Sequence, residues 1–594
     1  MIGPHPVEWL LGQPPRSALF GDVFHSAEGG LAEARQVFLD GCGLPEAWSG
    51  RQRYCIAELG FGVGRNMAAA LDLWARAGPA EGRLCLFSIE AFPLSAKDAA
   101  RALAAFPELA APAAALLSRW PGLARGFHRL DLPAYRATLD VAVMDVGEAL
   151  AAWSGQADAW FLDGFAPRLN PDMWRAQILE QVAAHSAPGA RLATYAAAGE
   201  VRRGLVRAGF EVTRAPGFAG KREQLRGQLA GASSASKPAP RVAIIGAGIA
   251  GASLKRAFDA QGVGARVIDA GAPCASAGPA ALVSPRLDAG LGAAAALHAQ
   301  AFARARQLYG SALSGEAALQ LAVGPKDARR FAVIAGAELF EAGAMVLRSA
   351  SEASRMLGEP APAALAIAGA GVIAPAEILR SWLGGARTSA EVARIVAGEG
   401  CWRLVRADGS PIAEAEIVCV AAAMASTGLV GGLPLSPVRG QASFAQGQGG
   451  LAGPVLFGGY AAPGAGGILF GATHDRGQVS LDVRPKDHAR NLAALGAALP
   501  ELAMRLAAAR MAAHVGVRAT TPDYLPLAGP APGAGPGLFV LTGLGSRGFS
   551  LSPLLAEHLA ARALGVPSPL PGPLAELVDP GRFARRAGRR EASL

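Results

Sequence analysis

The chain has 594 residues, of which 51% are hydrophobic and 17% charged, which excludes a disordered chain and predicts two or more globular domains. Its formal net charge of +9 favours polyanionic partners such as RNA, although an arginine-rich composition alone gives the same balance. The six cysteines show no CxxC spacing, no apolar run reaches transmembrane length and the N-terminus lacks a basic n-region, so we expect no metal site, no membrane span and a cytoplasmic location.

The run YCIAELGFGVG is typical of an apolar strand that ends at Glu58 and leads into a glycine loop. Gly60, Gly62 and Gly64 let the backbone turn sharply and approach a ligand, and the run 65–74 after them is helix-like. Open α/β sheets bind ligands at the carboxyl ends of such strands. The GxGxG spacing after an acidic residue suits the amino acid part of S-adenosylmethionine better than a pyrophosphate. A plain tight turn is the alternative.

Three further apolar strands also end in acidic residues. LCLFSIE ends at Glu90, LDVAVMD at Asp145 and ADAWFLD at Asp163. Glu90 is placed to accept the ribose hydroxyls of the cofactor, and Asp145 is a candidate for its adenine amino group. For each acid the alternative is a helix N-cap. The series as a whole predicts a Rossmann-like methyltransferase domain.

Asp163 is also the candidate catalytic residue of this half. Methyl transfer to an amine needs an unprotonated nitrogen held in line with the sulfonium, and a nearby carboxylate can orient the amine and take its proton. Phe165 and Trp174 follow it in DGFAPRLNPDMW. They are expected to line the substrate site or stack on a base, although core aromatics would serve equally well.

Residues 231–240, GASSASKPAP, are small, polar or proline and predict a linker between domains 1–230 and 241–594. The tail after Asp579 is arginine-rich, and we expect its end to be frayed.

The second half begins with a dinucleotide fingerprint. A β-branched strand leads into Gly246-x-Gly248-x-x-Gly251, a helix and a second strand that ends at Asp269. The first glycine makes the turn, the second admits the pyrophosphate, and the third lets helix and strand pack. Asp269 follows at the spacing expected of an acid that binds the adenosine ribose.

The far end of this half distinguishes FAD from NAD. The run LFVLTGLGSRGFSLSPLL resembles the glycine-rich turn and helix with which flavin oxidases of the D-amino acid and glycine oxidase class close on the isoalloxazine. A helix N-terminus there stabilises negative charge on the reduced ring. The turn supplies five expected cofactor contacts: Gly543, Gly545, Ser546, Arg547 and Gly548.

The run HVGVRATTPDYLPLAG resembles the segment of the same class in which an arginine pairs with the substrate carboxylate. Arg518 matches that position, and bidentate guanidinium–carboxylate pairing supplies both energy and orientation. Arg547 is a second candidate. A structural salt bridge is the alternative for Arg518.

Segments in both halves resemble the bifunctional tRNA 5-methylaminomethyl-2-thiouridine biosynthesis proteins. They are ELGFGVGRN, SIEAFPLS, DAWFLDGFAPRLNPDMW and GFAGKREQLRGQL in the first half, and ASAGPAALVSPRLD, LPLSPVRGQ and GGYAAPGAGGILFGATHD in the second. In the first half, two residues depart from the family pattern. Val63 removes a hydroxyl near the cofactor, and Arg65 adds a cation at a helix start, where the helix dipole disfavours it.

The resemblance implies a methyltransferase domain fused to an FAD-binding Rossmann domain with an inserted antiparallel substrate domain, and an additional cofactor contact from Ser276. It implies that the FAD half removes the carboxymethyl group of 5-carboxymethylaminomethyluridine at the tRNA wobble position as glyoxylate. The first half then methylates the resulting amine with S-adenosylmethionine. Lys221, Arg222 and other basic residues are candidate phosphate contacts, and a monomer is expected.

The sequence leaves two other functions open. One is a small amino acid oxidase with a degenerate methyltransferase domain, which Val63 and Arg65 would support. The other is a non-catalytic RNA-binding scaffold, against which two intact cofactor loops argue.

Overall fold

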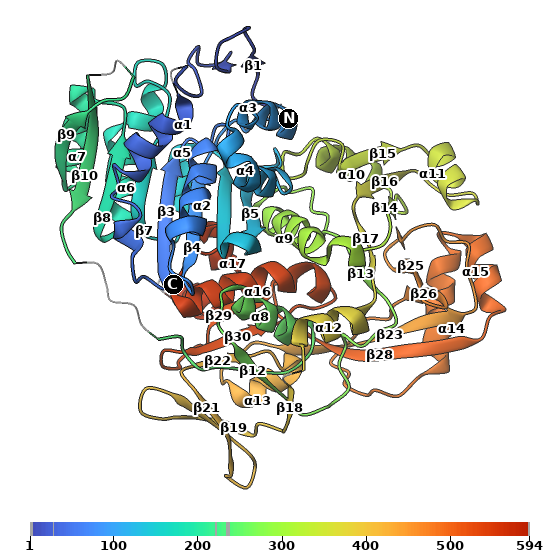
Figure 1. Ribbon diagram of the computed structural model, residues 1–594. Helices are drawn as coiled ribbons and strands as arrows, with labels where there is room; N and C mark the ends of the chain where they lie inside the picture. Colours follow the sequence, from blue (N-terminus) through green and yellow to red (C-terminus); the bar gives the residue numbers. More distant parts are fainter. Residues whose placement is uncertain (1–3, 28, 220–221, 233–237, 386, 592–594) are drawn as a thin grey trace. The chain divides into compact units, whose positions relative to one another are not determined.

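The computed structural model describes residues 4–27, 29–219, 222–232, 238–385 and 387–591, and the chain divides into two compact units (Figure 1). Unit 1 comprises Met1–Pro238 and Val566–Gly572, and unit 2 comprises Ala239–Gly565 and Pro573–Leu594. The first division falls inside the proposed linker 231–240, of which residues 233–237 lie outside the described part.

Unit 1 is built on one eight-stranded sheet. In spatial order its strands are β5 (Gly126–Leu132), β6 (Ala137–Val143), β4 (Arg83–Ile89), β3 (Arg53–Leu59), β7 (Ala157–Leu162), β8 (Ser186–Thr194), β10 (Glu223–Leu229) and β9 (Phe210–Pro216). The five strands from β6 to β8 are parallel, and the outer pairings of β5, β10 and β9 are antiparallel. Strand order reverses beside β3, so the sheet has a topological switch point there.

Helices cover both faces of this sheet. They are α1 (Gly30–Glu33), α2 (Arg65–Ala77), α3 (Ala96–Leu103), α4 (Ala110–Leu117), α5 (Val146–Ala152), α6 (Ala176–Ala184) and α7 (Gly199–Arg207). Side chains of β3 alternate between two hydrophobic cores: Tyr54 and Ile56 pack with α2 and α4, whereas Cys55 and Ala57 pack with α5 and α6. Burial on both faces explains why these strands are apolar throughout.

Unit 2 contains a six-stranded sheet that carries the dinucleotide fingerprint. Its spatial order is β18 (Arg387–Ser389), β12 (Ala265–Asp269), β11 (Val242–Ile245), β22 (Ile417–Val420), β30 (Leu538–Thr542) and β29 (Leu527–Pro530). All pairings are parallel except that of β29 with β30. Helix α8 (Ile249–Ala260) contacts α16 (Gly548–Leu564), which also contacts α9 (Ala293–Tyr309).

A second, nine-stranded sheet forms the expected inserted domain. It contains β15 (Met345–Arg348), β16 (Ala364–Ala368), β14 (Ala317–Leu321), β24 (Val455–Leu456), β25 (Tyr460–Gly464), β26 (Gly467–Gly471), β23 (Ser436–Gln446) and β27 (Asp475–Arg476), with β28 (Met511–Thr520) also paired to β23. Its pairings are antiparallel except for β14 with β24.

Strand β23 separates a structural face from a cavity face. Arg439 binds Asp487 at 2.7 Å, and Asn491 donates to Ser443 at 3.0 Å, so odd-numbered positions face α14 (Pro485–Gly496). Gly440 and Ala442 line a cavity on the opposite side. The two-residue period of the strand therefore directs its even-numbered positions towards the cavity.

The remaining elements are short. The helices are α10 (Asp327–Ala335), α11 (Ala350–Leu357), α12 (Pro375–Leu383), α13 (Ser426–Leu429), α15 (Pro500–Ala507), α17 (Gly572–Val578) and α18 (Arg582–Glu591). The small sheets are β1 (Val7–Glu8) with β2 (Arg16–Ser17), β13 (Ala281–Val283) with β17 (Gly371–Ile373), and β19 (Arg394–Ala397) with β20 (Trp402–Val405) and β21 (Pro411–Ala415).

The arginine-rich tail is helical through Glu591, and residues 592–594 lie outside the described part. Arg582 anchors this helix, because it is buried and donates to both carboxylate oxygens of Asp523 at 3.0 and 2.9 Å. Among the described residues, no single helix has the length and apolarity to cross a membrane, although the bent pair 96–103 and 107–117 passes by length and composition.

Candidate functional sites

The four acids predicted in unit 1 lie at one edge of its sheet. Glu58 is in β3, and Glu90, Asp145 and Asp163 directly follow or lie just beyond β4, β6 and β7. These four parallel strands are neighbours in the order β6-β4-β3-β7, so their carboxyl ends meet at the switch point.

Glu58 is buried, with 1% of its surface exposed. Its Oε1 accepts a hydrogen bond from Asn66 Nδ2 at 2.9 Å, and its Oε2 accepts one from Ser88 Oγ at 2.7 Å. Burial, reinforced by Asp163, raises the pKa of Glu58 to about 8 against these hydrogen bonds. The buried Glu58 carboxyl group therefore fixes the position of the Asn66 side chain.

Asn66 links Glu58 to the candidate catalytic acid. Its Nδ2 also donates to Asp163 Oδ2 at 2.6 Å, and Arg65 Nη2 lies 3.4 Å from the same oxygen. Gly60, with a φ of 92°, passes so close that a Cβ there would lie 2.5 Å from the Asp163 carbonyl. The glycine loop and the helix that follows it are thus in direct contact with Asp163. Sequence reasoning assigned no role to Asn66, although it lies in the quoted run ELGFGVGRN.

Glu90 and Asp145 are placed differently from each other. Glu90 accepts hydrogen bonds at 2.9 Å from the backbone of Gly62 and of Phe92, and burial raises its pKa to about 6. Asp145 is exposed and caps α5, because its Oδ1 accepts from Gly147 N at 2.9 Å. The N-cap alternative therefore describes Asp145, although its Oδ2 makes none of these cap bonds.

The two departures from the family pattern leave the loop intact. Val63 is buried with Leu94, Ala99 and Ala102 in a small apolar cluster. Two carboxylates offset the unfavourable interaction of the Arg65 cation with the helix dipole. Arg65 Nη1 lies 3.5 Å from Glu33, and Nη2 lies 3.4 Å from Asp163. The degenerate-domain hypothesis loses its support, since neither residue disrupts the site.

Phe165 belongs to an aromatic cluster that sequence reasoning missed. Its ring centroid lies 5.0 Å from that of Phe20 and 5.4 Å from that of Phe24, and His5 packs against the same group. These partners lie 141 to 160 residues before Phe165 in the chain, so no local pattern marks them. Trp174 is a core residue: it is buried, and its indole N–H donates to the Phe165 carbonyl at 2.9 Å.

The residues of unit 1 fit S-adenosylmethionine. Each Glu90 oxygen accepts one backbone hydrogen bond and retains capacity for a ribose hydroxyl. The exposed carboxylate of Asp145 retains an acceptor for an amino group. The glycine loop follows β3, next to the strand that ends before Glu90, at the switch point of the sheet.

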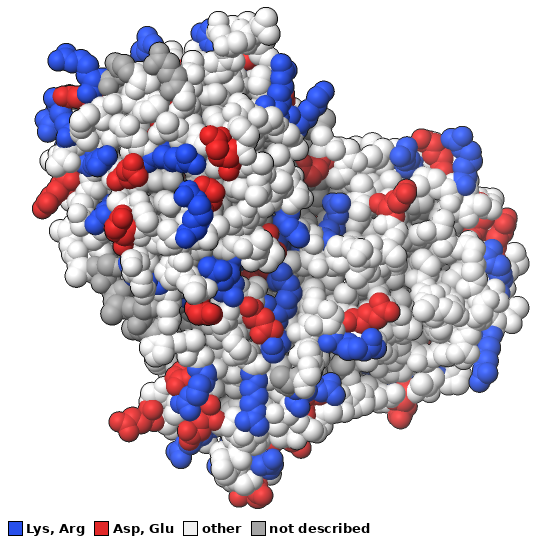
Figure 2. Space-filling model, viewed as in Figure 1, with Lys and Arg blue, Asp and Glu red and all other residues white. Residues whose placement is uncertain are grey.

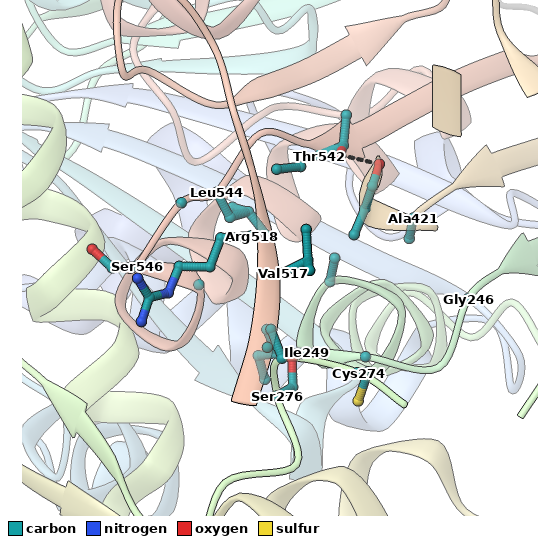
Figure 3. A pocket seen from close by; sticks show the side chains of 18 of the residues that line it. Gly246, Ile249, Cys274, Ser276, Ala421, Val517, Arg518, Thr542, Leu544 and Ser546 are labelled. Carbon is teal, nitrogen blue, oxygen red and sulfur yellow. Dashed lines mark hydrogen bonds between the residues drawn. The ribbon is translucent and has the colours of Figure 1, made fainter. Parts of the chain in front are cut away.

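Unit 2 contains a cavity of about 1040 Å³ that is lined by the cofactor residues predicted in this half, with the exception of Gly251 (Figure 3). Its lining includes Gly246, Gly248, Asp269, Ser276, Arg518, Gly543, Gly545, Ser546, Arg547 and Gly548. Gly251 lies just behind, where a Cβ would sit 1.8 Å from the Gly246 carbonyl oxygen. In Figure 3 the Arg518 side chain points towards the turn that carries Ser546, away from Cys274.

The fingerprint end of the cavity fits a dinucleotide. Ser276 Oγ accepts a hydrogen bond from Ile249 N at 3.2 Å and so fixes its loop against the start of α8. Asp269 accepts from Ala247 N at 3.2 Å and from Gly271 N at 3.3 Å. A helix N-terminus that opens onto the cavity favours a pyrophosphate, and the carboxylate beside it suits a ribose.

Arg518 lies at the other end without an acidic partner. Among the residues that the structure describes, no carboxylate lies within salt-bridge distance of its guanidinium, and burial lowers its pKa. A Cβ on Gly440 would lie 2.4 Å from Arg518 Nη2, so the guanidinium rests on the bare backbone of β23. The structural-salt-bridge alternative therefore does not describe Arg518.

Arg547 is held by main-chain and hydroxyl groups. Its Nη1 donates to Ser284 Oγ at 2.7 Å and to the Ser284 carbonyl at 3.2 Å, and burial together with Arg286 lowers its pKa to about 10. Tyr460, His474 and His514 also line the cavity. They lie within quoted motifs, but sequence reasoning gave them no role.

Among the described residues, the basic side chains that could bind RNA do not form a separate patch on the face in view (Figure 2). Figure 2 shows basic side chains interspersed with acidic ones on this face. Arg222 is exposed, whereas Lys221 lies outside the described residues. In the tail, Arg585 pairs with Asp579 at 2.9 Å and Arg586 with Asp523 at 2.7 Å. Among the described residues, no group of three or more His, Cys, Asp or Glu side chains is placed to hold a metal ion.

Comparison with known proteins finds one family model in each half of the chain. A model described as S-adenosyl-L-methionine-dependent methyltransferase matches residues 107–230, and one described as FAD dependent oxidoreductase matches residues 241–562. Among solved structures, iminodiacetate oxidase (IdaA) from Chelativorans sp. BNC1 is 24% identical, with a TM-score of 0.48, over 55% of this chain and 96% of that chain.

Relatives match both units together. The chain is 53% identical over 590 residues to the "tRNA 5-methylaminomethyl-2-thiouridine biosynthesis bifunctional protein MnmC" of Caulobacter sp. (strain K31), covering 98% of each. It is 38% identical over 599 residues to the protein of the same name from Maricaulis maris (strain MCS10), covering 99% of this chain and 97% of the relative. The predicted methyltransferase and FAD oxidoreductase domains are confirmed, and the chain belongs to the family of bifunctional tRNA 5-methylaminomethyl-2-thiouridine biosynthesis proteins.

Proposed function

We propose that this chain converts 5-carboxymethylaminomethyluridine at the wobble position of tRNA, with or without 2-thiolation, to 5-methylaminomethyluridine in two steps. Unit 2 removes the carboxymethyl group oxidatively, and unit 1 methylates the amine that remains. The observation that carries the proposal is identity to bifunctional relatives over 98% of the chain, in a protein whose two units each hold one site.

In the first step, the chain's main tasks are to bind and orient the substrate. The guanidinium of Arg518, which has no carboxylate partner among the described residues, suits the substrate carboxylate, because a bidentate pair fixes the adjacent carbon in one orientation. Gly440 supports that guanidinium from below. Bound FAD would supply the two-electron oxidation at that carbon, and water would hydrolyse the resulting imine to glyoxylate and the aminomethyl group. The residues that would hold FAD are those of the fingerprint, Ser276 and the turn 543–548.

In the second step, Asp163 is the proposed acceptor of the amine proton. Asn66 and Arg65 both contact its Oδ2, which holds the carboxylate in one orientation. S-adenosylmethionine, when bound, supplies the electrophilic methyl group, and Gly60, Gly62, Gly64, Glu58, Glu90 and Asp145 are its proposed environment. Phe165 is the proposed aromatic wall of the substrate site. Trp174 supports Phe165 through the hydrogen bond to its carbonyl.

The remaining proposals concern the setting of the reaction. We place the protein in the cytoplasm as a monomer without a membrane partner, and we retain Lys221, Arg222 and Arg547 as candidate contacts to substrate or cofactor. Size-exclusion chromatography coupled to light scattering tests the monomer.

The test is a two-stage conversion followed by mass spectrometry of the nucleosides. Wild-type protein with FAD, S-adenosylmethionine and tRNA that carries the carboxymethylaminomethyl group should form the methylaminomethyl nucleoside. Asp163→Ala should stop at the aminomethyl nucleoside, whereas Arg518→Ala should leave the substrate unconverted yet methylate tRNA supplied with the aminomethyl group. Each variant thus serves as the control for the other. Unchanged methylation by Asp163→Ala would remove that residue from its role.

A further inference from the structure

The turn that contains Tyr524 holds an aromatic side chain out in solvent. Tyr524 is 47% exposed, and its φ of 58° lies in the left-handed region that bulky residues rarely adopt. Such a conformation persists only where the surroundings fix it, and it occurs preferentially at functional sites.

The surroundings do fix this turn. Asp523 Oδ1 accepts hydrogen bonds from Thr521 Oγ1 at 3.1 Å and from Leu525 N at 3.2 Å, and Thr521 Oγ1 lies 2.6 Å from the Leu525 carbonyl. Arg582 from α18 binds both oxygens of Asp523. The backbone that carries the exposed Tyr524 ring is therefore fixed by the hydrogen bonds of Asp523.

Arg476 steadies the ring itself. Its Nη2 donates to the Tyr524 hydroxyl, and its Cζ lies 5.7 Å from the ring centroid. Among the described residues, no carboxylate lies within salt-bridge distance of Arg476, which is exposed. A cation beside an aromatic face is the combination with which proteins bind single-stranded nucleic acid.

The register of the sheet connects this pair to the oxidase cavity. Val438 of β23 pairs with Arg476 of β27 on one side and with Arg518 of β28 on the other. Residues directly opposite one another share a face, so Arg476 and Arg518 both lie on the cavity face, two strand spacings or about 10 Å apart. The exposed His474 lines the cavity beside Arg476.

We propose that Tyr524 and Arg476 form a base-binding subsite, in which the uracil ring stacks on Tyr524 while its side chain reaches Arg518. This inference rests on the proposed function. Four bonds separate C5 of the uracil from the carboxyl carbon, which spans roughly 5 Å when extended. The ring's own radius and the ion pair lengthen this reach to the order of the roughly 10 Å that separates the backbones of Arg476 and Arg518. The subsite binds the base, and Arg518 binds the group that the reaction removes.

The test is a binding cycle with anticodon stem-loop RNAs that carry either uridine or an abasic residue at the wobble position, measured by fluorescence anisotropy on the FAD-loaded full chain. Wild type should bind the uridine RNA on the order of tenfold more tightly than the abasic RNA, from the usual strength of base–aromatic stacking. Tyr524→Ala should abolish that difference, and Tyr524→Phe should keep most of it because the ring remains.

Controls separate the subsite from general effects. Arg355→Ala removes an exposed arginine of α11 and should leave the tenfold difference intact, whereas Arg476→Ala should reduce it. Equal binding of both RNAs by wild type, a difference that survives Tyr524→Ala, or a loss in Tyr524→Phe as large as in Tyr524→Ala would overturn the stacking subsite. Failure of wild type to convert tRNA in the nucleoside assay would instead refute the proposed function, so the two failures are distinguishable.

Discussion

The position of Gly440 beneath Arg518 allows oxidation to be impaired without touching a residue that binds substrate. In Gly440→Ala, the new Cβ would lie 2.4 Å from Nη2, 2.6 Å from Cζ and 2.7 Å from Nη1 of Arg518. Comfortable contacts need about 3.5 Å, so the guanidinium must move by roughly 1 Å. Because the clash falls on the end of a flexible side chain, we expect the fold to be retained.

The expected loss follows from the interaction that is displaced. A charge-assisted hydrogen bond contributes about 1.5–3 kcal/mol, which corresponds to a decrease of roughly 10- to 150-fold in kcat/KM. The assay is steady-state oxidation of tRNA that carries the carboxymethylaminomethyl group, with bound flavin measured by absorbance. Methylation of aminomethyl tRNA by unit 1 should be unchanged.

Gly449→Ala is the matched control, because a Cβ there meets nothing within 4 Å. If Gly440→Ala binds flavin and oxidises tRNA within about twofold of wild type, the guanidinium does not depend on this bare backbone, and Arg518 is not the carboxylate anchor in this geometry.

Three further outcomes are expected. Arg65→Leu removes the buried ion pair of Arg65 with Glu33 and should lower the free energy of unfolding by about 3–5 kcal/mol. Urea unfolding followed by tryptophan fluorescence measures this loss, because seven of the nine tryptophans lie in unit 1. Full stability in the single variant, or no recovery in Glu33→Gln/Arg65→Leu, would contradict a stabilising buried ion pair. Glu58 has a pKa raised to about 8 from an ordinary 4.5, so its protonated form is favoured in the fold. Its stabilising contribution is complete below pH 4.5 and is lost as pH rises towards 8, by at most about 1.4 kcal/mol per unit. Glu58→Gln should flatten that decline in chemical unfolding, and an unaltered slope would show that Glu58 is ionised throughout. Binding of tRNA should weaken steeply as salt rises, because phosphate contacts release counterions; an affinity that is flat from low to high salt would exclude an electrostatic interface.

Local sequence was sufficient for the elements that carry the cofactor loops. The expected strand before the first glycine loop is β3, and the run predicted as a helix after it is α2, extended to Ala77. The fingerprint from Gly246 to Asp269 forms the expected strand, helix and strand. These segments could be predicted because a glycine loop between a buried strand and a helix is specified by residues adjacent in the chain.

Several site residues could not be found in this way. Glu33 reaches Arg65 across 32 residues, and Asp163 reaches Asn66 across 97. From the sequence, Arg65 is therefore expected to be unfavourable at the start of the helix, although the fold places two carboxylates beside it. The sequence also left Trp174 open as a substrate contact, whereas packing places it in the core.

The sequence by itself determined the two domain types, the cofactor loops and the acids at the strand ends, because each depends on short-range backbone geometry and hydrophobic periodicity. Only the tertiary structure decided which charged groups are paired and which are left to bind a ligand. Arg65 is paired, and the guanidinium of Arg518 rests on Gly440 without a carboxylate partner among the described residues. Charges interact through space rather than along the chain, so their partners are set by strand register and packing.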